Sequence, residues 1–153
     1  MTRLEISRRV RSLTRDFSES IFRGQDIIDF INEGIDRFIQ LIPELQGLSH
    51  LRNNNDAPLL IPNAYRHLLS IYSASRCFSQ DERYYQATTL MNEFETKLDE
   101  LKSKIESGSI IITNPQTGEP IQVYYDSEYV ITNNYFRNSS GFVSSDESVE
   151  GVN

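Results

Sequence analysis

The sequence predicts a mainly α-helical protein, a small bundle of about four helices followed by a C-terminal β-hairpin and an extended arm. Apolar residues recur at spacings of three and four through residues 1–107, which is the period of helices with one buried face. After Gly108 the period changes to β-branched and aromatic runs around the turn sequence NPQTGEP. We therefore expect a helical body, residues 1–107, a hairpin and arm, residues 108–136, and a Ser-rich acidic tail, residues 137–153.

The first predicted helix begins at a T-x-x-E capping box formed by Thr2 and Glu5. Four apolar residues then recur at helical spacing and predict one buried stripe: Ile6, Val10, Leu13 and Phe17. We expect residues 18–24 to form the loop that leads to the second helix.

The second predicted helix lies in DIIDFINEGIDRFIQLIPEL, residues 26–45, and Pro43 stops it. Its apolar stripe has five members: Ile27, Ile31, Ile35, Phe38 and Ile42. Residues 43–61 have turn chemistry and no period, so we expect a long surface loop. Loops of that length are usually functional or disordered.

The third predicted helix has Pro62 in its first turn. Its apolar face is broad: Tyr65, Leu68, Ile71, Tyr72, Ser75 and Phe78. The small residues 73–75 predict the close approach of another helix.

A second capping box, Ser79 and Glu82, is predicted to open the longest helix, which Gly108 ends. Its stripe alternates spacings of three and four: Tyr84, Ala87, Met91, Phe94, Leu98, Leu101 and Ile105. This pattern fits either a coiled-coil seam between subunits or one antiparallel helix within a small bundle.

Residues 109–113 and 121–125 are the two predicted strands of the hairpin. Two strands alone are marginal in water, so something must cover them. The arm either folds back on its own helices or adds a strand to a partner, and we favour the partner. The predicted partner-binding residues are apolar or aromatic: Ile110, Ile112, Ile121, Val123, Tyr124, Tyr125, Tyr129, Tyr135 and Phe136.

The formal charge of −7 is unevenly spread, because residues 1–23 hold six Arg against three carboxylates, a net +3, which leaves −10 for residues 24–153. An acidic chain is a poor candidate for wrapping nucleic acid, since phosphate contacts need clustered Lys and Arg. One possible charged contact face remains on the first helix: Arg3, Arg8, Arg11 and Arg15. This face is either a solvated helix surface or a phosphate-binding one.

The chain contains few of the residue patterns that carry chemistry. His50 and His67 have no partner at metal-ligand spacing, and Cys77, the one cysteine, cannot form an internal disulfide. Asp26, Asp29 and Glu33 share a helix face, which suits a solvated first turn better than a metal. We therefore expect no enzymatic activity, no cofactor and no metal site.

Other classes of location are excluded by hydropathy. The longest apolar runs are only a few residues, such as 110–112, whereas a membrane span needs about 20. No apolar block follows the N-terminal arginines, so we expect no secretory signal and synthesis in the cytoplasm.

One arrangement of residues resembles the head-tail adaptor, or connector, proteins of tailed double-stranded DNA phages. The matching elements are Ile31-Asn32, Ile61-Pro62, Tyr72 to Ala74, Asp81-Glu82 and Asn92 to Phe94, in that order. They correspond to an early helix with an IN-x-G-like start, a loop ending in an Ile-Pro step, a helix of Tyr and small residues, a D-E pair, and a long helix with an N-x-F segment. The resemblance covers roughly residues 1–107.

The resemblance implies a structural virion protein located at the head-tail interface, or neck, and made in the host bacterial cytoplasm. Its subunits would form a ring, twelve by family resemblance, beneath the portal protein, extend the DNA channel and receive a downstream neck or tail-completion protein. DNA would be passing cargo only, and no membrane is involved.

Two other classes of function stay open. A small helical nucleic-acid-binding regulator would use the Arg-rich first helix, and a helical module could use its arm as a tether to a catalytic partner.

Overall fold

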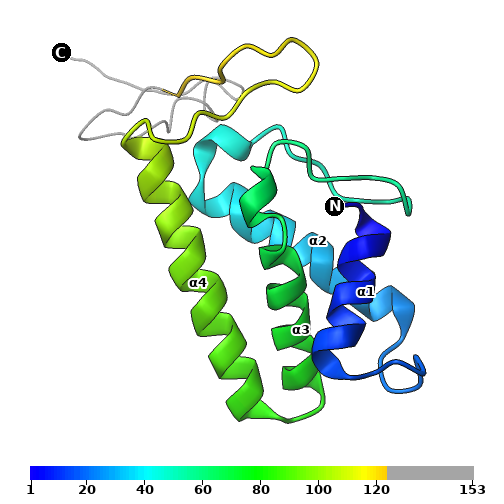
Figure 1. Ribbon diagram of the computed structural model, residues 1–153. Helices are drawn as coiled ribbons and strands as arrows, with labels where there is room; N and C mark the ends of the chain where they lie inside the picture. Colours follow the sequence, from blue (N-terminus) through cyan, green and yellow to red (C-terminus); the bar gives the residue numbers. More distant parts are fainter. Residues whose placement is uncertain (124–153) are drawn as a thin grey trace, which may run out of the picture. The chain divides into compact units, whose positions relative to one another are not determined.

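The computed structural model describes residues 1–123, and these residues form a mainly helical protein, as the sequence predicts. The elements follow in the order α1 (Arg3–Thr14), α2 (Gly24–Leu41), the 3-10 turns η1 (Pro43–Leu45) and η2 (Asn63–Tyr65), α3 (Leu68–Gln80) and α4 (Tyr84–Glu106). Met1–Ile121 form one compact unit. Helix α3 is central, because it packs against α1, α2 and α4 (Figure 1).

The small residues of α3 explain how three helices reach it. Ser73, Ala74 and Ser75 are all buried, which confirms the predicted close approach. The two hydroxyls do not go unpaired: Ser73 Oγ donates to the Ile27 carbonyl at 3.3 Å, and Ser75 Oγ donates to the Ala87 carbonyl at 2.6 Å. Each serine therefore joins α3 to a neighbouring helix as well as making room for it.

Helix α1 begins as predicted but ends early. Thr2 is the N-cap, and its Oγ1 accepts the Glu5 N–H at 3.3 Å. The helix stops at Thr14, where Arg15 takes a left-handed conformation with φ 61°. Ile6 and Val10 are buried, but the predicted stripe is wrong at Leu13, which is half-exposed, and at Phe17, which is 73% exposed.

Helix α2 confirms its predicted stripe, since all five residues are buried: Ile27, Ile31, Ile35, Phe38 and Ile42. Gly34 lies on the α3 side of this helix. A Cβ there would meet Leu69 Cδ2 and Tyr72 Cδ1 at 3.2 Å each, so the glycine sets how closely α2 and α3 approach.

The connection from residue 43 to 61 is not the surface loop that the sequence predicts. Leu45, Leu48, Leu51 and Ile61 are buried in the main core. The connection is also fixed by hydrogen bonds, because the Asn32 side chain accepts the Leu51 N–H at 2.8 Å and donates to the Leu51 carbonyl at 3.4 Å. This segment therefore contributes side chains to the core without forming an α-helix.

The predicted capping box before α4 is wrong. Ser79 lies inside α3, and Glu82 adopts φ 59° in the turn between the helices. The turn is closed instead by backbone bonds, from the Glu82 N–H to the Ser79 carbonyl at 3.1 Å and from the Arg83 N–H to the Phe78 carbonyl at 2.8 Å.

The α4 stripe packs within the subunit, which favours the antiparallel bundle helix over a seam between subunits. Five of its seven members are buried: Ala87, Phe94, Leu98, Leu101 and Ile105. Met91 is half-buried against the core, and the prediction is wrong at Tyr84, which is largely exposed. Gly108 ends the helix with φ 82°, as expected of a C-terminal glycine.

The chain after α4 stays on the body for longer than the sequence indicates. Ile112 is only 3% exposed and belongs to the core, so the body extends past residue 107. An antiparallel bridge joins Thr113 and Pro120, supported by a hydrogen bond from the Ile121 N–H to the Ile112 carbonyl at 2.8 Å. The predicted second strand runs on to residue 125, beyond the described residues, and the full hairpin stays a prediction.

Candidate assembly surfaces

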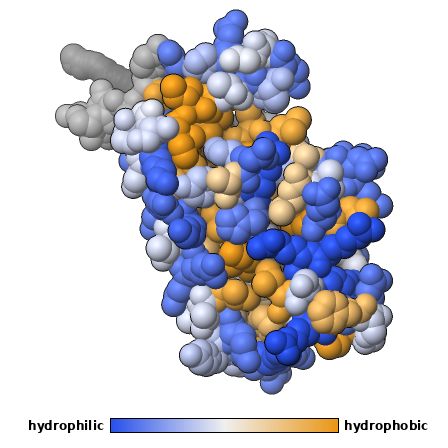
Figure 2. Space-filling model, in the orientation of Figure 1, coloured by the Kyte–Doolittle hydropathy of each residue, from blue (hydrophilic) through white to orange (hydrophobic). Residues whose placement is uncertain are grey.

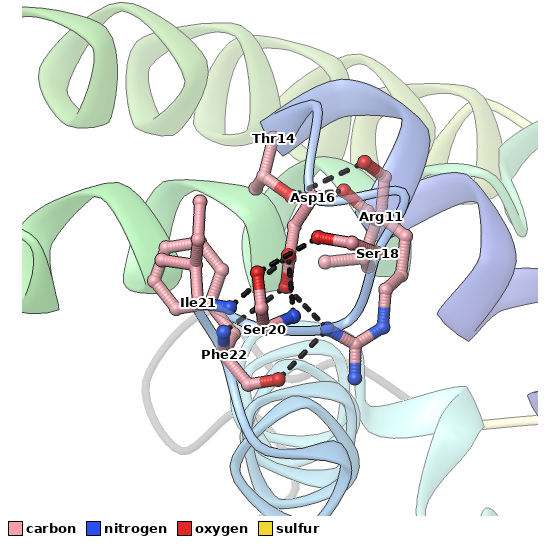
Figure 3. A network of polar contacts seen from close by, with 8 residues as sticks. Arg11, Thr14, Asp16, Ser18, Ser20, Ile21 and Phe22 are labelled. Atoms are coloured by element: carbon pink, nitrogen blue, oxygen red, sulfur yellow. Dashed lines mark hydrogen bonds and ion pairs between the residues drawn. The ribbon is translucent and has the colours of Figure 1, made fainter.

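The first candidate site is the buried carboxylate of Asp16, which is 1% exposed. Its Oδ1 accepts the Ser20 and Ile21 N–H groups at 2.9 and 3.1 Å, and its Oδ2 accepts the Phe22 N–H at 3.0 Å. The Arg11 guanidinium donates to Oδ2 and also to the Phe22 carbonyl (Figure 3). Both carboxylate oxygens are therefore used within the α1–α2 loop.

The electrostatics of this cluster agree with a structural role. Burial works against the charged form of Asp16, but the three backbone N–H donors and Arg11 outweigh it and hold the pKa of that carboxyl below its usual value. The carboxylate thus stays ionised and fixes the residues that follow α1, and no oxygen is left to bind a ligand.

The predicted arginine face divides into two structural residues and two free ones. Arg11 holds the α1–α2 loop, and Arg3 donates to the Arg52 carbonyl and to Asn54 Oδ1 of the 43–61 connection. Arg8 and Arg15 are exposed and make no ion pair within residues 1–123. Arg9, which the predicted four-residue face does not include, is also exposed and makes no ion pair within residues 1–123.

The carboxylates that share the outer face of α2 are engaged with cations and amides. Asp26 makes a two-pronged contact with Arg23, at 2.7 and 3.0 Å, and Asp29 accepts from Gln25 at 2.8 Å. Glu33 accepts from Arg76 Nε at 2.8 Å. In the described part of the chain, no three His, Cys, Asp or Glu side chains gather as metal ligands would.

Two side chains that could be reactive, Cys77 and Tyr72, are held in protonated, unreactive forms. Burial raises the pKa of the Cys77 thiol to about 12, so it stays protonated near neutral pH. Burial, together with the neighbouring Glu33 carboxylate, raises the pKa of the Tyr72 hydroxyl to about 12. His50, in turn, bonds the exposed Asp36 carboxylate at 2.8 Å, outside any buried cluster.

The predicted partner-binding residues have different positions in the structure. Ile112 lies in the core of the body and is only 3% exposed, so its role in partner binding stays a prediction. Ile110 and Ile121 are half-buried against the core, and Val123 is partly exposed. The other five lie outside the described residues: Tyr124, Tyr125, Tyr129, Tyr135 and Phe136.

One open pocket, of about 610 Å³, lies between the 43–61 connection and the turn that follows α4. Its walls mix polar and apolar groups, among them His50, Asp56, Leu59, Asn114 and Ile121. Asp56 accepts the Arg52 and Asn53 N–H groups at 2.8 Å each, so its carboxylate is already used in shaping the loop.

A second hollow, of about 410 Å³, is more apolar and lies at the other end of α4. We call it the α1/α4 groove, and its lining comes from three helices: Leu13 of α1, Phe78 of α3, and Tyr85, Gln86, Thr89 and Leu90 of α4. Tyr85 is 78% exposed. Figure 2 shows hydrophobic surface among hydrophilic patches on the face that displays α1, α3 and α4.

Neither hollow was predicted from the sequence. The predicted stripe of α1 places Leu13 in the core, whereas Leu13 is 36% exposed. Tyr85 sits outside the helical stripe of α4, and that position was the one available signal.

Among the described residues, no helix is long and apolar enough to cross a bilayer.

Comparison of the chain with protein-family models, curated proteins and solved structures finds no match.

Proposed function

We propose that the protein is a structural virion protein, a head-tail adaptor that forms a ring below the portal of a tailed phage. The observation that carries this proposal is the position of the residues that resemble the adaptor family. Tyr72 and Phe94, from two different matching segments, meet with ring centroids 5.0 Å apart, and Phe94 also meets Phe38 at 5.9 Å. Tyr72 and Phe94 thus belong to one aromatic contact that joins α2, α3 and α4.

The other matching segments also have physical roles in the body. In the IN-x-G segment, Ile31 is in the core, Asn32 holds the 43–61 connection through Leu51, and Gly34 allows α3 to approach. Ile61 is buried at the Ile-Pro step, directly before η2. Such residues define a scaffold, which suits a protein whose work is assembly.

The surfaces of the body also support a subunit of a ring. The subunits of a cyclic ring meet through head-to-tail contacts, so each subunit needs two different surfaces, one for each neighbour. The α1/α4 groove, at the first turns of α4, offers one candidate surface of this kind.

The experiment is reconstitution with the portal protein encoded in the same phage genome. We expect the purified full-length chain and the portal to form rings with a central channel, seen by negative-stain electron microscopy and mass photometry. A chain that binds neither the portal nor itself at micromolar concentration contradicts the proposal.

A second candidate, a nucleic-acid-binding regulator, is favoured by one observation. Arg8, Arg9 and Arg15 are exposed on α1 or directly after it and are free of ion pairs within residues 1–123. Binding to a DNA duplex that weakens steeply with salt, and that is lost on changing these arginines to Gln, would support the regulator over the adaptor.

A further inference from the structure

We propose that the α1/α4 groove of one copy binds the aromatic segment 124–136 of a second copy. This inference rests on the proposed function, because it assigns the surface that receives the arm of a neighbouring subunit. The groove is a surface feature of residues 1–121, and the occupant is identified from its sequence.

The groove has the character of an unfilled binding surface. The helices that form its walls leave Leu13 and Tyr85 exposed, and the buried Phe78 and half-buried Leu90 also line this hollow of about 410 Å³. Phe17, four residues after Leu13 and beyond the end of α1, is 73% exposed. Clustered exposed apolar side chains on a small protein commonly mark an interaction site.

The C-terminal sequence contains an occupant of matching chemistry. Residues 124–136 read YYDSEYVITNNYF, with five aromatic residues, Val130 and Ile131 in thirteen positions. Aromatic side chains bury a large apolar area and often provide most of the binding energy in interfaces. The segment therefore supplies several candidate anchors for an apolar groove.

The charges agree with this pairing. The segment carries Asp126 and Glu128 and has no Lys or Arg. Arg9 lies one helical turn before Leu13 on the same side of α1, and the Arg83 guanidinium stands 4.6 Å from the centre of the Phe78 ring. Arg83, in contact with the Phe78 ring, is a cation at the groove lining, although it also contacts Asp81 at 3.5 Å, and Glu93 lies one turn after Thr89.

The length of the segment allows it to reach another copy. Thirteen extended residues span up to about 45 Å, whereas the 23 residues of α4 measure roughly 35 Å. Docking on the same chain would occupy the groove within each subunit and create no contact between subunits. Docking on the next copy gives every subunit one arm and one receiving groove, which is the head-to-tail contact that closes a ring.

The test uses two full-length variants that each carry one added cysteine, Thr89→Cys in the groove and Tyr129→Cys in the segment. The native Cys77 can remain, because it is buried and its raised pKa keeps the thiol unreactive. The two variants are mixed under mild oxidation without portal, and the cross-linked peptides are identified by mass spectrometry. We expect a disulfide between residues 89 and 129 of different chains.

The matched control is Thr88→Cys, which is also exposed but lies about 100° around α4 from Thr89. We expect it to cross-link to residue 129 at least tenfold less. Equal cross-linking at both positions, or none at either, overturns the proposal. A double variant, Thr89→Cys with Tyr129→Cys, that links only within one chain at a concentration at which the protein self-associates also overturns it.

A second measurement does not depend on disulfides. Leu13→Ser with Tyr85→Ser removes exposed apolar groups, so the fold should persist, and we expect self-association to weaken at least tenfold. Leu59→Ser is the control, because it removes an exposed apolar side chain from the other pocket. The proposal is wrong if Leu59→Ser disrupts self-association and the Leu13→Ser, Tyr85→Ser variant does not. It is also wrong if the Leu13→Ser, Tyr85→Ser variant loses portal binding but keeps self-association, because the groove then has another occupant.

These readings separate the two proposals. Cross-links between residues 89 and 129 without any portal-bound ring would leave the groove assignment standing and remove the adaptor function. Portal-bound rings without that cross-link would support the adaptor function and overturn the groove assignment.

Discussion

The rings of Tyr72 and Phe94 meet edge to face, with planes at 61°, at the point where α2, α3 and α4 come together. Phe94 is fully buried, whereas the Tyr72 hydroxyl reaches the surface and donates to Glu33 Oε1 at 3.2 Å. Phe94 therefore fills the interior of the contact, and Tyr72 connects that interior to the polar network outside.

Phe94→Ala should lower the free energy of unfolding by roughly 3 to 5 kcal/mol, because the bundle cannot collapse fully into the space left by the ring. Chemical denaturation of the monomer measures this loss. Tyr84→Ala is the control on the same helix, and it should change stability by less than about 0.5 kcal/mol because Tyr84 is largely exposed. Similar effects of the two substitutions would contradict the assignment of Phe94 to the core.

Asp16→Ala should destabilise the protein by roughly 3 kcal/mol, because it leaves the Arg11 guanidinium and three backbone N–H groups without their acceptor. Thermal and chemical unfolding would both show the loss. Asp29→Ala removes an exposed carboxylate from α2 and should have little effect.

The same carboxylate gives a pH dependence of known sign. The folded-state pKa of Asp16 lies below the unfolded value of about 3.9, so its stabilisation is fully present above that value and is lost as the pH falls through it toward the folded pKa. The stability difference between the wild type and Asp16→Asn should therefore shrink when the pH is lowered from 6 to 3. A constant difference across that range would show that the charge of Asp16 does not stabilise the fold.

The regular parts of the fold could be predicted because their periods are complete. The five-residue stripe of α2 and the core positions of α4 from Phe94 onward are set by helical spacing alone, and each is buried. A segment without regular secondary structure has no hydrophobic period. The sequence therefore predicts a surface loop at residues 43–61, although Leu45, Leu48 and Leu51 of this segment belong to the core.

The errors at helix ends have a different cause. Whether α1 continues through Phe17 depends on the bonds that Asp16 makes with residues 20–22, which a local pattern does not contain. Likewise, the S-x-x-E pattern at Ser79 and Glu82 fits a capping box, but here the same spacing closes a turn through backbone bonds. The α1/α4 groove could not be predicted from the α1 stripe, because that stripe places Leu13 in the core, whereas Leu13 lines the groove with Tyr85.

Substitutions at Gly34 should separate helix propensity from helix spacing. Gly34→Ala should be near neutral, because a gain of about 1 kcal/mol in helix propensity offsets a Cβ contact at 3.2 Å with two side-chain ends that can shift slightly. Gly34→Leu should cost about 1 to 3 kcal/mol, since the added carbons must displace Leu69 or Tyr72. Equal stability of the Leu and Ala variants in chemical denaturation would mean that α2 and α3 are not in close contact here.

Two truncated chains should show where the body ends and separate stability from assembly. A chain that ends at Ile121 keeps Ile112 in the core and the half-buried Ile110 and Ile121, so its unfolding should match that of the full chain. A chain that ends at Gly108 loses all three side chains and should be less stable by about 2 kcal/mol or more, since burying one isoleucine contributes about that much. Guanidinium titrations followed by helical circular dichroism measure both values.

Both chains lack residues 124–136, so neither should self-associate or join the portal, although only the shorter one is destabilised. Equal stability of the two chains would show that residues 109–121 do not belong to the body, and self-association of the chain ending at Ile121 would show that the aromatic segment is not the contact between subunits.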